Sequence, residues 1–355
     1  MRRLVLVWLL VSACGGEAVE VRAVSDLGLV TQDPNIRGRD GALSSTVFGR
    51  SVWTFGDTVL EAPDARGENW HHNSYATGSK DGFTLTDPVD ASGAPRYVLP
   101  PTLAEQTFID AHAGDDCEVE PCRARYAAWP GRAVELPDGD AVVFYELIYA
   151  EPGEFSFEGV GSSLARWRDY DAPAERLWVD RVEGHPDLLW TADEGPWLHA
   201  PVVEGDFLHV FSCPVSLGTH ACRLARAPLD HFEAFEDWRY FDGDQWVANP
   251  GDAKDLFDAG SILEVAYDET LDAWLAIYSA PFSHDVKART APSLTGPWSD
   301  ATTLFEAPED HAPYDAVHHP EWSDGAAHYV TYSTPTEAFL GSELRLWRVE
   351  LGPVP

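Results

Sequence analysis

Four acidic residues stand where a side chain could do chemistry, at the edges of short apolar runs or inside them. They are Asp40 in Gly38-Arg39-Asp40-Gly41, Asp57 at the end of the run 51–57, Glu264 within the run 261–267, and Glu321 after His318-His319-Pro320. Hydrolysis of a glycosidic bond needs two carboxyl groups that face the bond, one protonated and the other ionised. We therefore take these four residues as candidates for a catalytic acid and base.

Each candidate also has a purely structural interpretation. Asp40 could form an Asx-turn, and Asp57 could cap the turn that follows its strand. Glu264 could be a hydrogen-bonded core residue, but a glutamate among apolar residues is costly unless it is paired or used. Burial would also raise its pKa towards the range of a general acid. Glu146, in Phe144-Tyr145-Glu146-Leu147, is better explained as a partner for loop backbone.

A second group of side chains suits the binding of a sugar. The candidates are Trp53, His199, Asp315, His318 and His319, with Trp129 and Trp197 as further aromatic surfaces. Histidines that meet near one axis could instead hold a metal ion, or they could be satisfied polar groups. In an extended strand His318 faces one side, whereas His319 and Glu321 face the other. Only one of the two histidines is therefore expected to share a pocket with Glu321.

The elements that must position these residues are strands, because almost no stretch keeps a helical apolar period. Five apolar strands beginning at residues 51, 141, 206, 273 and 328 are each followed by a strand that we interpret as an alternation of small or apolar residues with Arg or Lys. Such repetition is typical of a β-propeller. We predict an all-β fold, a five-bladed β-propeller of four-stranded antiparallel blades, with a β-sandwich as the alternative. A candidate strand at 19–30 could pair with the last blade and close the ring.

Three phrases resemble a known bacterial family. The segments 37–41 and 49–58 resemble the opening of the family called domain of unknown function 4185, and Tyr314-Asp315-Ala316-Val317-His318-His319-Pro320-Glu321 resembles its last blade. The phrase 291–298 is similar to one common in five-bladed glycoside hydrolases. The resemblance implies a carbohydrate-active propeller related to endo-D-arabinanases. It therefore implies a glycoside hydrolase acting on a furanosidic, arabinan-like polysaccharide. The alternative is a non-catalytic surface propeller that binds a glycan or a protein.

The start of the chain predicts export. Two arginines precede a short apolar run, and Val11-Ser12-Ala13-Cys14 resembles the site at which bacterial lipoproteins are lipidated on cysteine. We expect a signal peptide at 1–13, a lipidated tether at 14–24 and one propeller domain at 25–355. No aspartate follows Cys14, which predicts an outer-membrane lipoprotein on the periplasmic or cell-surface side. The other four cysteines predict the local disulfides Cys117–Cys122 and Cys213–Cys222.

The charge of the chain limits its partners. A formal net charge of −35 argues against nucleic acid and against adsorption to anionic lipid, so we expect contact with a membrane only through the lipid anchor. Phosphate-loop, dinucleotide and zinc-protease motifs are missing from the sequence. We expect a monomer that binds a polysaccharide and uses no cofactor. A structural calcium or another axial ion stays open.

Overall fold

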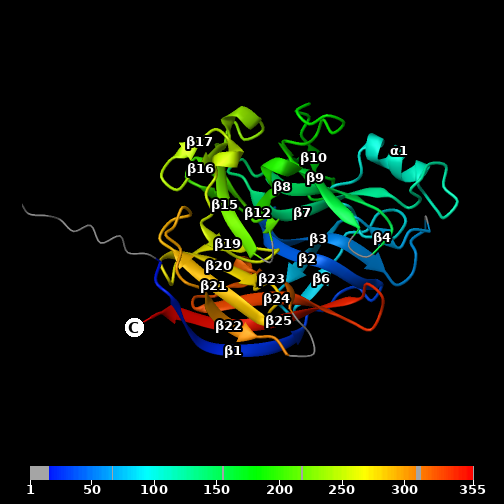
Figure 1. Cartoon of the computed structure of the whole chain (residues 1–355). Helices are drawn as coiled ribbons and strands as arrows, with labels where there is room; N and C mark the ends of the chain where they lie inside the picture. The colour runs from blue at the N-terminus through cyan, green and yellow to red at the C-terminus, as the bar shows by residue number, and fades with distance from the viewer. Residues whose placement is uncertain (1–15, 66, 154–155, 217–218, 309–312, 355) are drawn as a thin grey trace, which may run out of the picture.

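Five small antiparallel sheets follow one another along the chain and form a five-bladed β-propeller (Figure 1). The computed structural model describes residues 16–65, 67–153, 156–216, 219–308 and 313–354. The signal peptide and the Cys14 lipidation site predicted above lie outside these residues. None of the described helices is long and apolar enough to cross a membrane.

Each blade is a meander whose first strand lies nearest the axis. Blade 1 contains β2 (Ile36–Val47), β3 (Arg50–Leu60), β5 (Ser74–Ser79) and β6 (Thr84–Thr86), with β4 (Trp70–His71) paired to β3. Blade 2 contains β7 (Arg125–Glu135), β8 (Ala141–Ala150), β9 (Phe157–Trp167) and β10 (Glu175–Arg176), with β11 (Trp190–Thr191) paired to β9. Blade 3 contains β12 (Trp197–Glu204), β13 (Phe207–Ser212), β15 (Thr219–Pro228), β16 (Arg239–Phe241) and β17 (Trp246–Val247), with β14 (Val215–Ser216) and β18 (Phe257–Asp258) paired to β15.

The last two blades complete the ring. Blade 4 contains β19 (Glu264–Asp268), β20 (Ala273–Ser279), β21 (Asp285–Ala291) and β22 (Thr302–Glu306). Blade 5 contains β23 (Tyr314–His318), β24 (Ala327–Pro335), β25 (Ser342–Pro353) and β1 (Val19–Leu29). The pairing of β1 with β25 confirms the predicted closure by the N-terminal strand, which removes a free sheet edge. This strand begins inside the range 14–24 that was assigned to the tether.

Helical structure is confined to connections. The one α-helix of the described part of the chain, α1 (Leu103–Ala111), begins at a capping box of Thr102 and Glu105 and lies between blades 1 and 2. The 3-10 turns among the described residues are η1 (Ala192–Glu194), η2 (Phe235–Asp237), η3 (Pro250–Asp252) and η4 (Pro320–Trp322). Both predicted disulfides are present, Cys117–Cys122 in the loop after α1 and Cys213–Cys222 in blade 3.

The apolar core is divided into clusters between neighbouring blades. Successive side chains of a strand point to opposite faces, so the second strand of each blade supplies both adjoining clusters. On β3, Val52 packs towards blade 2, whereas Trp53 and Phe55 pack towards blade 5. Trp53 has no exposed surface and stacks on His319 with ring centroids 4.1 Å apart. The prediction that Trp53 binds sugar is therefore wrong: the alternation of β3 makes it a core residue.

Candidate functional site

Asp40, Asp57 and Asp315 come together near one end of the propeller axis. Asp40 lies on β2 and Asp57 on β3 of blade 1, and Asp315 lies on β23 of blade 5. The charge of Asp57 acts on Asp40, and that of Asp40 acts on Asp315. A Cβ atom at Gly56, beside Asp57, would lie 3.7 Å from the Asp40 Cβ. The ring thus places residues from both ends of the chain beside one another.

A pocket of about 310 Å³ opens on Asp40 and Asp57. Its wall also includes Trp70, Tyr314 and Ser333, together with the hairpin between β24 and β25. The volume is at the lower end of the range for small-molecule sites, about 300–1,000 Å³.

The same end of the axis receives residues from the other blades. Asp315 accepts a hydrogen bond from Ser261 Oγ at 3.2 Å, and the Gly41 backbone N–H faces its carboxyl. His199 Nε2 donates to the Ser261 carbonyl at 3.1 Å, which leaves its Nδ1 as a buried acceptor with no hydrogen-bond partner among the described residues. Burial lowers the pKa of His199 to about 4, so its ring is neutral at pH 7. Trp129 of blade 2 also reaches this end of the axis: its Cδ1 would lie 3.7 Å from a Cβ atom at Gly56.

The carboxyls of this cluster differ in their electrostatic surroundings. Burial and the charge of Asp57 raise the pKa of Asp40 to about 7, and burial and the charge of Asp40 raise that of Asp315 to about 8. Burial also raises the pKa of Asp57, but the Arg125 guanidinium, whose Nη2 lies 3.9 Å from Asp57 Oδ2, opposes the rise. The indole N–H groups of Trp70 and Trp129 face Asp57 and oppose it further. Asp57 is consequently the carboxyl best able to stay ionised while Asp40 holds a proton.

Several buried polar atoms around the pocket lack a hydrogen-bond partner within the described part of the chain. They are Asp57 Oδ1, Trp70 Nε1, Trp129 Nε1 and Ser333 Oγ. The two indole N–H groups face Asp57 without reaching hydrogen-bond geometry. Buried polar atoms are nearly always satisfied, so a water molecule or a ligand hydroxyl between them would complete the set. The set holds two donors, one acceptor and one hydroxyl that can act as either, which suits a ligand rich in hydroxyl groups.

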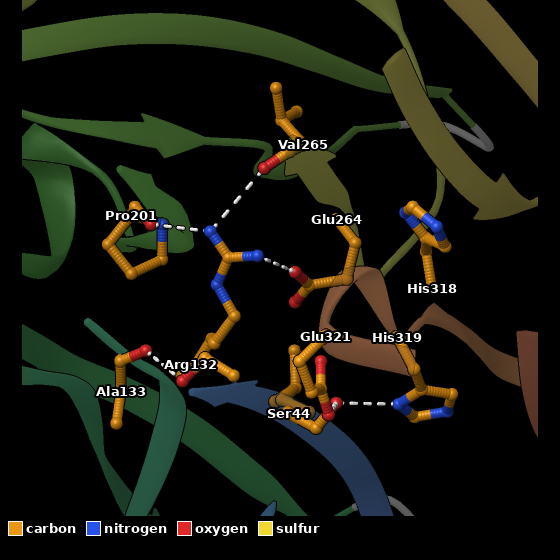
Figure 2. A network of polar contacts seen from close by, with 12 residues as sticks. Ser44, Arg132, Ala133, Pro201, Glu264, Val265, His318, His319 and Glu321 are labelled. Carbon is orange, nitrogen blue, oxygen red and sulfur yellow. Dashed lines mark hydrogen bonds and ion pairs between the residues drawn. The ribbon is translucent and has the colours of Figure 1, made fainter. Parts of the chain in front are cut away.

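Glu264 and Glu321 do not join this cluster. The first half of β2 and the start of β23 line the pocket described above, whereas residues 44–46 of β2 and Glu321 after β23 line a second pocket of about 510 Å³. Figure 2 shows Glu264 in an ion pair with Arg132, whose Nη1 lies 2.7 Å from Glu264 Oε2. Arg132 Nη2 also donates to the Pro201 carbonyl at 2.7 Å. The prediction grouped four catalytic carboxyls, but only Asp40 and Asp57 of those four share a pocket. The position of a residue along an inner strand determines which end of the axis its side chain reaches.

Glu321 is held by hydroxyl groups rather than by a cation. Ser44 and Ser51 each donate to Glu321 Oε1 at 2.7 Å, and His319 Nδ1 lies 2.6 Å from Ser44 Oγ (Figure 2). Because Ser44 gives its one proton to Glu321, the His319 Nδ1–H donates to Ser44. His319 Nε2 is then the acceptor for Thr331 Oγ1, which lies 2.8 Å away. The expectation that only one of the two adjacent histidines meets Glu321 is thus met by His319.

His318 belongs to a separate buried group. Its Nε2 lies 3.2 Å from His328 Nδ1, and His328 Nε2 lies 3.4 Å from Asp268 Oδ2. No three axial residues within the described ranges bring possible metal-ligating atoms within 4.8 Å of one another; the groups that do are Asp64-Glu68-His71 and Cys117-Glu120-Cys122. The second of these holds a disulfide.

The sequence profile described as "Domain of unknown function (DUF4185)" matches residues 152–337, which is more than half of the chain. The chain belongs to the DUF4185 family. Among proteins with curated descriptions, none matches this sequence.

Solved structures share the fold of this DUF4185 chain at low sequence identity. A protein from Bacteroides ovatus, provisionally described as a hydrolase, is 15% identical with a TM-score of 0.57, covering 92% of this chain and 87% of its own. An exo-beta-1,3-galactanase from Phanerochaete chrysosporium, solved with beta-1,3-galactotriose, is 12% identical with a TM-score of 0.51, covering 94% and 67%. A GH43_1 enzyme from Xanthomonas citri, solved with xylose, is 12% identical with a TM-score of 0.50, covering 92% and 90%. At these identities the likeness establishes the five-bladed fold.

Some residues around the pocket of this DUF4185 chain were not predicted from the sequence. Arg125 lies in the stretch 96–135, where none of the family-like phrases occurs, and Trp70 stands in a polar segment that has no recognisable motif. Ser333 lies on β24 of the last blade, and a serine in an apolar strand carries no chemical signal by itself. Of the additional aromatic candidates, Trp129 faces Asp57, whereas Trp197 is buried between blades 2 and 3.

The buried carboxyls predict how stability depends on pH. Folding raises the pKa values of Asp40, Glu146 and Glu264 to about 7 and that of Asp315 to about 8. Up to those values the folded state binds more protons than the unfolded state, so these groups lower stability as pH rises. Burial lowers the pKa values of histidines such as His199 and His319 in the folded state. These histidines therefore change the pH dependence of stability only below their usual pKa of about 6.5. Thermal melts should therefore show Tm falling between about pH 6.5 and about pH 8.5.

The contribution of one carboxyl can be separated from the rest. Asp315→Asn cannot ionise, so its melting temperature should fall less over the same pH window than that of the parent chain. A Tm of the parent chain that stays level or rises over this window would contradict the prediction, because other groups would then offset the cost of ionising the buried carboxyls.

Proposed function

We propose that the chain is a glycoside hydrolase whose acid and base are Asp40 and Asp57. The observation that carries the proposal is the contrast between two neighbouring carboxyls in one pocket. Asp57 faces a guanidinium and two indole N–H groups, whereas no such group lowers the pKa of Asp40. Neighbouring titratable groups whose surroundings push their pKa values apart are the usual basis for assigning acid and base.

The proposed reaction breaks the bond between an anomeric carbon and the glycosidic oxygen. The Asp40 carboxyl donates its proton to that oxygen, and the ionised Asp57 acts at the anomeric carbon, either by taking a proton from the attacking water or by direct attack. Two carboxyls supply all the proton transfers, so the proposal needs no cofactor. Asp315 and His199 position the pocket through Ser261 and Gly41. Proton NMR of the first anomer released distinguishes the two courses.

The proposed substrate is a furanosidic, arabinan-like polysaccharide. Support comes from the resemblance to arabinan-acting propellers and from the unpartnered donors and acceptors of the pocket, which match sugar hydroxyls. The purified chain should release reducing sugar from D-arabinan or L-arabinan and not from xylan or galactan. Binding to a polysaccharide without release of reducing sugar would instead favour the non-catalytic surface propeller.

We also propose that the chain is a monomer anchored through lipidated Cys14 to the outer membrane. The basic start, the short apolar run and the sequence Val11-Ser12-Ala13-Cys14 support this location. Cys14→Ser should release the protein from the membrane fraction, and a variant that stays with the membrane would contradict lipid anchoring.

A further inference from the structure

We propose that Trp129, Glu146, Phe157 and Gly159 form a further sugar subsite, called here the blade 2 platform, which binds the sugar ring beyond the two rings that are joined by the bond at Asp40 and Asp57. The proposal rests on the proposed function and names how the same site selects longer substrates. Nothing in the catalytic pair itself requires these four residues.

The register of blade 2 places the platform on one side of the sheet. Trp129 on β7 pairs directly with Glu146 on β8, so their side chains are neighbours on the same face. The Phe157 ring, at the start of β9, meets the Trp129 ring edge-on, with centroids 5.3 Å apart and planes at 67°. Because Trp129 also faces Asp57, the platform begins where the catalytic pocket ends.

The aromatic corner leaves apolar surface open to solvent. Phe157 is 49% exposed, although most large aromatic side chains of this chain are buried in the clusters between blades. A rigid aromatic corner beside a few polar groups is the usual composition of a ligand site. The apolar C–H face of a sugar ring would cover this surface at little conformational cost.

Glu146 supplies the polar group of the platform. The other glutamates held inside the described fold have protein partners: Glu264 has Arg132, Glu105 has Arg176, and Glu321 has two serines. Glu146 has neither a cation nor a hydrogen-bond donor among the described residues, and burial alone raises its pKa to about 7. A carboxyl in this state can both donate to and accept from adjacent hydroxyl groups of a sugar.

Gly159 leaves room for the Glu146 carboxyl. A Cβ atom at Gly159 would lie 2.5 Å from Glu146 Oε1, so any side chain there would force the carboxyl to move. Glycine within a strand often marks the close approach of another group. Here the approaching group is the Glu146 carboxyl, which is partly exposed and has no hydrogen-bond partner among the described residues, so it is free to meet a ligand.

The test measures how binding depends on substrate length. Oligosaccharides of two to six rings, prepared from D-arabinan and L-arabinan, are titrated calorimetrically into Asp57→Asn protein, alone and combined with Phe157→Ala or Glu146→Gln. Each added change should weaken binding of the longer oligosaccharides by about 5- to 10-fold, as expected for one aromatic or charged contact, and leave the two-ring sugar unaffected. Phe282→Ala and Glu158→Gln, at exposed positions outside the platform, are the matched controls and should change neither.

The outcomes separate the two proposals. If the parent chain hydrolyses no polysaccharide but Phe157→Ala and Glu146→Gln still weaken binding of long oligosaccharides, the proposed hydrolysis fails and the platform stands. If the parent chain hydrolyses arabinan while both variants bind long and short oligosaccharides as tightly as Asp57→Asn alone, the platform is overturned. Equal loss for short and long oligosaccharides also overturns it, because the residues would then serve the catalytic pocket itself.

Discussion

Asp57→Asn is expected to lower kcat/KM on the cleaved polysaccharide by about 100- to 10,000-fold, the usual contribution of a positioned acid or base. The amide keeps the shape of the side chain and its contacts with Trp70 and Trp129, but it can neither attack an anomeric carbon nor accept a proton from water. The Arg125 guanidinium would then lack its nearest carboxylate. Reducing-sugar release at a fixed pH measures the loss, and the melting temperature shows that the variant is folded.

Two further variants make this prediction specific. Asp81→Asn makes the same chemical change at an exposed turn of blade 1 and should leave the rate unchanged. Asp40→Asn should be nearly inactive on polysaccharide yet retain much of its rate on an aryl arabinofuranoside, because a good leaving group needs no proton from an acid. It should also lose the fall in activity above about pH 7 that ionisation of Asp40 imposes on the parent. Equal activity of Asp57→Asn and the parent would remove Asp57 from the mechanism.

The blades were predictable because their signal is local. Each predicted pair of strands is adjacent in the sheets: β3 with β5, β8 with β9, β13 with β15, β20 with β21, and β24 with β25. Alternation of apolar residues and turn residues between strands suffices for that level of structure. The disulfides were equally local, since their cysteines are five and nine positions apart.

The composition of the site was harder to predict because it depends on position along the inner strands. Asp40 and Ser44 are four residues apart on β2, yet they line different pockets. Register shifts in β2 on either side of Gly41, and in β7 between Pro130 and Ala133, alter which side chains face the axis. The apolar residues around Glu264 were enough to predict that it is buried. Its structural role depends on Arg132, a partner far away in sequence that the local pattern does not reveal.

Arg132→Met is expected to lower the free energy of unfolding by about 3–5 kcal/mol, the usual effect of leaving one member of a buried ion pair alone. Glu264 is fully buried, and methionine keeps much of the apolar stem of Arg132, so the loss reports the missing charge. Burial and the charge of Glu321 already raise the pKa of Glu264 to about 7 against the opposing effect of Arg132. Urea unfolding should therefore show a larger loss at about pH 8, where Glu264 would have to ionise without its cation, than at about pH 6.

Removing both charges should reverse most of this loss. The double variant Arg132→Met, Glu264→Leu replaces the pair by apolar side chains of similar size, a change that is often neutral or stabilising.

Glu264→Gln should hydrolyse polysaccharide at the parental rate, because Glu264 lies away from the pocket of Asp40 and Asp57 and has Arg132 as its partner. A folded but inactive Glu264→Gln protein would return Glu264 to the catalytic pair, and an Arg132→Met protein as stable as the parent would show that the ion pair contributes nothing to the ring.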